Sequence, residues 1–166
     1  MNPLGGATRE WNYVQTVKEN YPLYLMGGVN FVPSPAEWNT KFLDTYRFKA
    51  PFVAEAMAHL GVHAVGVSAD DLWIGPEKLQ ELARVNHLHF ISSNIMKKGA
   101  PLFPAYWQGL FQETPVLVLG VTDLRAGGKL AAGVSLRSPE KSLEKIFAKK
   151  ELFAQNPVVF LVSDVP

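Results

Sequence analysis

The sequence of 166 residues contains no cysteine. Disulfides, thiolate zinc sites, iron–sulfur clusters and cysteine nucleophiles are therefore excluded. No apolar run approaches the roughly 20 residues that are needed to span a bilayer. Residues 1–6 also lack the charged start and the apolar stretch of a signal peptide. We expect a soluble chain without a membrane span.

Neither sign of charge is in excess. Lys and Arg number 16 and Asp and Glu number 15, so the formal net charge is +1. A chain without a strong field of one sign is not expected to bind nucleic acid. Hydrophobic residues make up 48% of the sequence, which is enough to build a core. A chain of this length fits one domain, and we predict a single domain over residues 1–166.

Short apolar runs alternate with segments of helical spacing. The predicted strands cover residues 22–26, 63–67, 88–92, 115–121 and 157–163. The predicted helices cover residues 7–20 and 51–60 and two segments that begin at Pro76 and Pro139. Strands that alternate with helices favour parallel pairing, so we predict an α/β fold with a mostly parallel or mixed sheet flanked by helices. The run over residues 158–162 is typical of a central strand.

Residues 32–51 carry aromatic side chains without a sustained period, which predicts a long loop with at most one helical turn. The aromatic set consists of Trp38, Phe42, Tyr46 and Phe48, together with Trp107 from elsewhere in the chain. If these rings are exposed, they form a contact surface, because aromatic side chains contribute much of the energy at interfaces. If they are buried, they form a small core beneath the loop.

In an open α/β sheet, ligands bind beyond the carboxyl ends of the strands, so the turns after the strands are the places to search. These turns read Gly27-Gly28-Val29-Asn30, Ser68-Ala69-Asp70-Asp71, Ser93-Asn94, Thr122-Asp123 and Ser163-Asp164. The candidates for binding a phosphate or nucleotide are Gly27, Gly28, Asn30 and Asn94.

Carboxylates recur in the same turns. Asp70, Asp71, Asp123 and Asp164 could gather at one edge of the sheet and bind a hard cation such as Mg²⁺ or Ca²⁺. Alternatively, Asp70 or Asp71 caps the turn before the next helix and the others are solvated. A separate pair, His87 and His89, would share one face of a strand, but a metal site there has no third ligand.

Several segments follow one another in a characteristic order. They are Leu25-Met26-Gly27-Gly28-Val29-Asn30-Phe31, residues 64–75, and Phe90-Ile91-Ser92-Ser93-Asn94-Ile95. This series resembles the N-terminal part of calcineurin-like metallophosphoesterases of the 5′-nucleotidase kind, and the resemblance covers nearly the whole chain. It implies part of an αββα sandwich. It also implies chemistry in which two divalent cations, bridged by an Asp, activate a water for attack on phosphate.

The metal-ligand positions of that family carry other residues in this sequence. Val29 stands where the family has its bridging Asp, and Ala69-Asp70 stand where it has an Asn-His pair. Asp164 stands in place of the His of a Ser-His pair. The family's first Asp-x-His and last Gly-His-x-His would fall outside residues 1–166. The side chains of Val29 and Ala69 have no lone pair for a cation, so we expect no metal cofactor.

Together these patterns favour a non-catalytic metallophosphoesterase-like domain that acts as a scaffold or protein-interaction module and is truncated relative to the full family domain. A missing first strand would leave a sheet edge open, which favours self-association or pairing with another protein. Two alternatives remain open: a metal-dependent phosphoesterase or nucleotidase that uses Mn²⁺, Mg²⁺ or Ca²⁺ at a rebuilt carboxylate site, and a phosphate- or nucleotide-binding module without hydrolysis. The resemblance suggests an extracytoplasmic location.

Overall fold

The computed structural model describes residues 7–18, 20, 23–28, 30–32, 42–123 and 130–163. The helices are α1 (Ala7–Val17), α2 (Leu43–Leu60), α3 (Pro76–Val85) and α4 (Pro139–Phe147), with the 3-10 helices η2 (Asp71–Ile74) and η3 (Lys150–Phe153). The strands are β1 (Leu25–Met26), β2 (Ala64–Gly66), β3 (Phe90–Ile91), β4 (Ile95–Lys97), β5 (Ala100–Pro101), β6 (Tyr106–Phe111), β7 (Thr114–Val121), β8 (Val134–Leu136) and β9 (Val158–Ser163). No helix in this part of the chain has the length and apolar character needed to cross a membrane.

The described strands form three sheets. The first sheet, in the order β1-β2-β3, is entirely parallel. The second sheet, in the order β6-β7-β9, is mixed, because β7 pairs antiparallel with β6 and parallel with β9. A small antiparallel sheet, β5-β4-β8, closes one end. The first and second sheets lie against each other, with β2 in contact with both β7 and β9.

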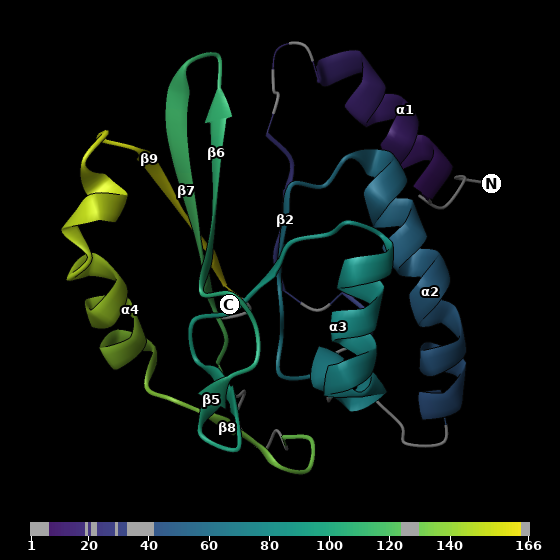
Figure 1. Cartoon of the computed structure of the whole chain (residues 1–166). Coiled ribbons are helices and arrows are strands. Elements are labelled where there is room, and N and C mark those ends of the chain that lie inside the picture. Colours follow the sequence, from purple (N-terminus) through teal and green to yellow (C-terminus); the bar gives the residue numbers. More distant parts are fainter. Residues whose placement is uncertain are drawn as a thin grey trace.

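The molecule therefore has four layers (Figure 1). Helices α2 and α3 cover the outer face of the first sheet, and α4 covers the outer face of the second. One buried apolar cluster lies under α2 and α3, a second lies between the sheets, and a third lies under α4. The predicted α/β fold, with parallel and mixed sheets flanked by helices, is confirmed, and the order of the layers is that of an αββα sandwich.

Helix α2 is longer than the sequence predicts. The expectation of a loop over residues 32–51 is wrong for its second half, because α2 begins at Leu43 and continues through Pro51. The buried residues of this helix recur every three or four positions: Ala50, Ala54, Met57 and Leu60. Their packing against the first sheet offsets the one main-chain hydrogen bond that the proline removes. Residues 33–41, including Trp38, lie outside the described part of the chain.

The two stacked sheets come close together at the carboxyl ends of their strands. A Cβ atom on Gly66 would lie 2.6 Å from Cγ1 of Val162, and one on Gly120 would lie 2.5 Å from the carbonyl oxygen of Ile91. Ordinary carbon contacts are about 3.5–4.0 Å, so a larger residue at either position would force the sheets apart. Glycine is therefore what lets the turns after strands of both sheets meet in one region.

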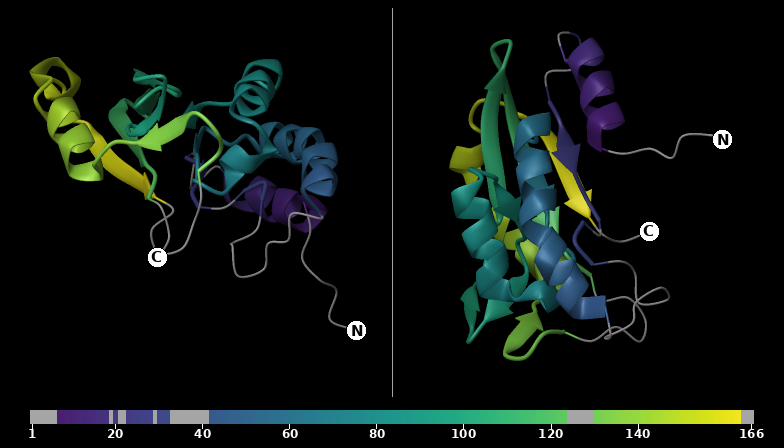
Figure 2. Two further views of the ribbon diagram at one scale, coloured as in Figure 1. Left: turned by 90° about the horizontal axis from the view of Figure 1, so that it is seen from below. Right: turned by 90° about the vertical axis from the view of Figure 1, so that its right-hand side faces the viewer.

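Strand β9 is an edge strand in the described part of the chain, so the expectation of a central strand is wrong there. Its first four residues are between 39% and 56% exposed: Val158, Val159, Phe160 and Leu161. Phe160 pairs with Val118, which belongs to the cluster between the sheets, and Leu161 pairs with Leu119, which belongs to the cluster under α4. Apolar side chains thus lie on both faces of this edge strand. Figure 2 shows β9 at the margin of the second sheet, as far as the chain is described.

Candidate functional site

The turns that follow the strands of both sheets meet at one edge, as the sequence predicts. The side-chain amide of Asn30, after β1, donates to the carbonyl oxygen of Gly66 at the end of β2 (3.1 Å). The hydroxyl of Thr122, after β7, donates to the carbonyl oxygen of Val67 (2.5 Å). These bonds connect turns from both sheets, so this edge is the candidate functional site.

Asp71 is a buried carboxylate that connects two of these turns. Its Oδ1 atom accepts from the main-chain N–H groups of Asn30 (3.1 Å), Phe31 (2.7 Å) and Val32 (3.3 Å). Its Oδ2 atom accepts from the N–H group of Ser68 (3.2 Å), whose hydroxyl in turn accepts from the N–H group of Asp71 (3.0 Å). Burial raises the pKa of Asp71 to about 6, against the opposing effect of these N–H donors. Both carboxylate oxygens already serve the chain, which suits an anchor for residues 30–32 better than a metal ligand.

Asn94 is fully buried and also serves the fold. Its side-chain N–H groups donate to the carbonyl oxygens of Thr122 (2.6 Å) and Arg137 (3.2 Å), and its Oδ1 atom accepts from the N–H group of Thr122 (2.9 Å). The hydroxyls of Ser92 and Thr122 lie 2.8 Å apart. Recognition of a ligand by the Asn94 side chain would require some of these bonds to break.

The glycine turn after β1 is held by its own contacts. Gly28 has a φ of 81°, a left-handed conformation that favours glycine, and its carbonyl oxygen accepts from the Asn30 side chain (3.0 Å). A Cβ atom on Gly27 would lie 2.9 Å from Cγ1 of Val162, so this glycine permits close packing against β9. Val29, at the centre of the turn, lies outside the described residues. Anion binding by this turn stays a prediction.

The remaining carboxylates are spread over the site. Ala69 and Asp70 are buried just before η2, where the Asp70 side chain makes no capping hydrogen bond, and Asp123 is exposed after β7. Asp164 lies outside the described residues. Within the ranges that the structure describes, no three His, Asp or Glu side chains are close enough together to hold a metal ion. The donors present there do not fit a two-metal site, although the rebuilt carboxylate site as a whole stays a hypothesis.

His87 and His89 lie just before the amino end of β3, whereas these turns lie at the carboxyl ends of the strands. His87 sits in a turn with a φ of 55°, and both imidazoles are exposed. The ring of His89 lies beside the indole of Trp107, with 5.9 Å between the ring centroids, and His63 lies at the same distance from that indole. Burial lowers the pKa of His63, which favours its neutral form. His89 therefore borders an aromatic group that includes Trp107.

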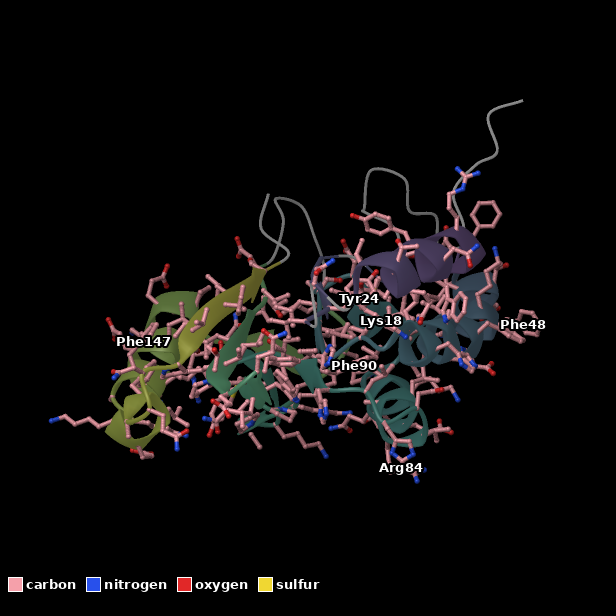
Figure 3. The ribbon with its side chains drawn as sticks, turned by 90° about the horizontal axis from the view of Figure 1, so that it is seen from above. Lys18, Tyr24, Phe48, Arg84, Phe90 and Phe147 are labelled. Atoms are coloured by element: carbon pink, nitrogen blue, oxygen red, sulfur yellow. The ribbon has the colours of Figure 1, made fainter. Side chains whose placement is uncertain are left out.

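The aromatic set of the sequence separates into two groups. Phe42 and Phe48 are 52% and 72% exposed, and Phe48 projects outward from α2 in Figure 3. Tyr46 is half-buried and packs against the cluster under α2 and α3, and Trp107 is half-buried beside the cluster between the sheets. The interpretation as a core therefore applies to Tyr46 and Trp107, whereas Phe42 and Phe48 are exposed and a contact surface there stays a prediction.

No protein-family model matches the sequence, and no curated protein matches it. Solved structures do match its fold. A 5′-nucleotidase precursor from Thermus thermophilus has a TM-score of 0.72 and 20% identity, over 97% of this chain and 32% of that one. The sulfate thiohydrolase SoxB from Thermus thermophilus has a TM-score of 0.74 and 22% identity, over 97% and 30% of the two chains. The calcineurin-like phosphoesterase YfkN from Bacillus subtilis has a TM-score of 0.72 and 14% identity, over 98% and 54%.

The chain thus spans about a third to a half of the length of these proteins. At such low identity the likeness concerns the fold alone. The described structure has the fold of 5′-nucleotidases and calcineurin-like phosphoesterases, and the resemblance that the sequence predicts is confirmed at that level.

Proposed function

We propose that this chain is a phosphoesterase-fold domain that does not hydrolyse phosphate esters and that acts through assembly with a second copy of itself. The observation that carries the proposal is the open edge of β9, where four consecutive apolar side chains are exposed. The donor set at the carboxyl ends of the strands supports the absence of hydrolysis.

The absence of hydrolysis follows from what each donor position offers. Ala69 presents a methyl group where the sequence resemblance implies a metal ligand, and a methyl group cannot bind a cation. The oxygens of Asp71 accept four main-chain N–H groups, and the amide of Asn94 is engaged by Thr122 and Arg137. A pair of hard cations needs several free oxygen ligands at short range. The polar side chains of Asp71 and Asn94 are committed to the fold instead.

Assembly follows from the chemistry of the β9 edge. Charged residues and prolines protect natural edge strands from pairing with other chains. Residues 158–162 contain neither. Apolar side chains on both faces suit a neighbour strand that is also apolar on both faces, and β9 itself has this pattern. Two copies that pair β9 antiparallel across a two-fold axis would join their second sheets into one. By contrast, the edge strands of the first sheet, β1 and β3, have only two residues each.

The oligomeric state tests this assembly. Sedimentation velocity over a wide concentration range is expected to show a dimer for the wild type and a monomer for the double variant Val159→Lys/Leu161→Lys. Both side chains are exposed, at 41% and 56%, so the fold should tolerate the lysines. The control is Leu110→Lys, which changes a 67% exposed leucine on β6, the opposite edge of the same sheet, and should leave the dimer intact. A wild type that is monomeric throughout, or a control that dissociates equally, would refute the assembly.

Hydrolysis is tested separately. A chromogenic phosphodiester and a nucleoside monophosphate are assayed with Mn²⁺, Mg²⁺ and Ca²⁺, and we expect no turnover above that of the metal alone. Asp70→Ala is the accompanying variant, because Asp70 is buried in the turn after β2, where the sequence resemblance implies a family ligand position. Metal-dependent turnover that disappears in Asp70→Ala would establish the rebuilt carboxylate site and overturn the non-catalytic proposal.

A further inference from the structure

A pocket of about 510 Å³ opens on the opposite side of the sandwich from β9. It lies between the end of α3, the start of β3 and strand β6, where the edges of the two stacked sheets meet. Its size falls in the range of roughly 300–1,000 Å³ that is typical of small-molecule sites. We call it the β3–β6 pocket. It is separate from the turns at the carboxyl ends of the strands and does not depend on the proposed function.

One wall of the β3–β6 pocket is aromatic and apolar. Trp107 lines it from β6, and Phe103 lines it from the preceding segment. The indole of Trp107 is held in place because it lies over Gly109, where a Cβ atom would come within 2.2 Å of its Cη2 atom. Phe111 packs beside the indole, with 5.9 Å between ring centroids. A flat ring can stack on a surface fixed in this way at little cost in side-chain entropy.

The other wall carries nitrogen donors and no carboxylate. Arg84 projects from the end of α3 (Figure 3), and His87 and His89 follow it. None of the residues that line the pocket is Asp or Glu. Glu81, three residues before Arg84 on α3, forms its ion pair with Lys78 (2.9 Å), and its interaction with Arg84 is weaker. An arginine beside a concave apolar surface is suited to a planar carboxylate, which its guanidinium binds with two parallel hydrogen bonds.

From this charge and shape we propose that the β3–β6 pocket binds an aromatic carboxylate. The ring of the ligand stacks against Trp107, and its carboxylate accepts hydrogen bonds from Arg84 at the rim, where His89 can donate as well. A neutral ligand of the same shape retains the stacking but loses the charge-assisted hydrogen bonds, so it binds more weakly.

Titration with naphthalene-2-carboxylate tests the proposal, and naphthalene-2-carboxamide serves as the neutral probe of the same shape. Binding is followed by calorimetry and by the NMR signal of the Trp107 indole N–H, which is assigned with Trp107→Phe. We expect saturable binding of the carboxylate, a shift of that signal, and binding of the amide that is weaker by about tenfold or more.

Two Arg→Gln variants distinguish binding in the β3–β6 pocket from general attraction to positive surface charge. Arg84→Gln should weaken carboxylate binding by about tenfold or more and leave binding of the amide unchanged. Arg9→Gln removes an exposed arginine on α1, away from the pocket, and should leave both unchanged. The proposal would be overturned if the two probes bind with equal affinity or if the two variants have equal effects. It would also be overturned if the Trp107 signal does not shift or if no saturable binding is seen.

Discussion

The contact between Gly66 and Val162 measures how closely the two stacked sheets approach. In Gly66→Ala the new Cβ atom would lie 2.6 Å from Cγ1 of Val162, about 1 Å inside the normal separation of carbon atoms. Val162 is only 7% exposed, so its side chain has little room to move away. We expect Gly66→Ala to lower the free energy of unfolding by about 1–3 kcal/mol, the usual cost of overpacking a core.

The second half of this prediction removes the opposing atom. Val162→Ala deletes both γ carbons and should cost about 2 kcal/mol, from about 0.8 kcal/mol for each buried carbon and a small cavity term. In the double variant Gly66→Ala/Val162→Ala, the added methyl group enters the space that Cγ1 leaves. The loss in free energy of unfolding in the double variant should therefore be about 1–2 kcal/mol smaller than the sum of the losses in the two single variants.

Equilibrium unfolding in urea, followed by circular dichroism, gives the four free energies of this cycle. The control cycle combines Val162→Ala with Gly61→Ala. Gly61 ends α2 with a φ of 74° and no atom near its missing Cβ, so alanine there strains the backbone without touching Val162. In this control cycle, the losses in free energy of unfolding caused by Gly61→Ala and Val162→Ala should add. If the losses of Gly66→Ala and Val162→Ala also add, the close approach of the sheets at this point is not what requires glycine.

Three further predictions concern single residues. Because burial raises the pKa of Asp71 from 3.8 to about 6, its charge opposes folding above pH 6 and ceases to do so below pH 4. When the pH falls from 7 to 4, the free energy of unfolding of the wild type, measured in urea, should therefore rise by up to about 3 kcal/mol relative to that of Asp71→Asn. The same pH dependence in both proteins would contradict this. Asn94→Ala should cost about 3–5 kcal/mol in the same assay, because it leaves several buried groups of Thr122 and its neighbours unpaired; a loss below 1 kcal/mol would contradict the network. Ser138→Ala should cost about 1 kcal/mol in thermal unfolding, since the Ser138 hydroxyl accepts from the N–H group of Lys141 at the start of α4, and Ser138→Asp should restore the loss.

Local sequence signals were sufficient for the alternation of strands and helices and for the turns that form the candidate site. They failed at Pro51, because the preference of proline for the first turn of a helix is a local signal, whereas the burial of Ala50 and Ala54 depends on the sheet beneath them. They also failed for β9, because a strand with apolar residues on both faces has the same pattern whether or not a neighbour covers its edge.

The features that the sequence did not predict depend on contacts between distant parts of the chain. The role of Asp71 depends on N–H groups about forty residues earlier, and no spacing in the sequence indicates that they meet. The β3–β6 pocket exists only because the two sheets stack and bring Trp107 next to His89. One local signal was present: Gly109 follows Trp107 by two positions on the same face of a strand, as expected where a large ring folds over a residue without a side chain.

The buried hydrogen bonds of Asn94 and Thr122 have a consequence for how the protein opens. Thr122 follows a strand of the second sheet, and it bonds both to Asn94, which follows a strand of the first, and to Val67, which follows another. Separating the two sheets would break these buried hydrogen bonds and the packing around them at the same time, so the layers should come apart together rather than in stages. The main-chain amide proton of Thr122 should accordingly be among the last to exchange with deuterated solvent, at a rate set by complete unfolding.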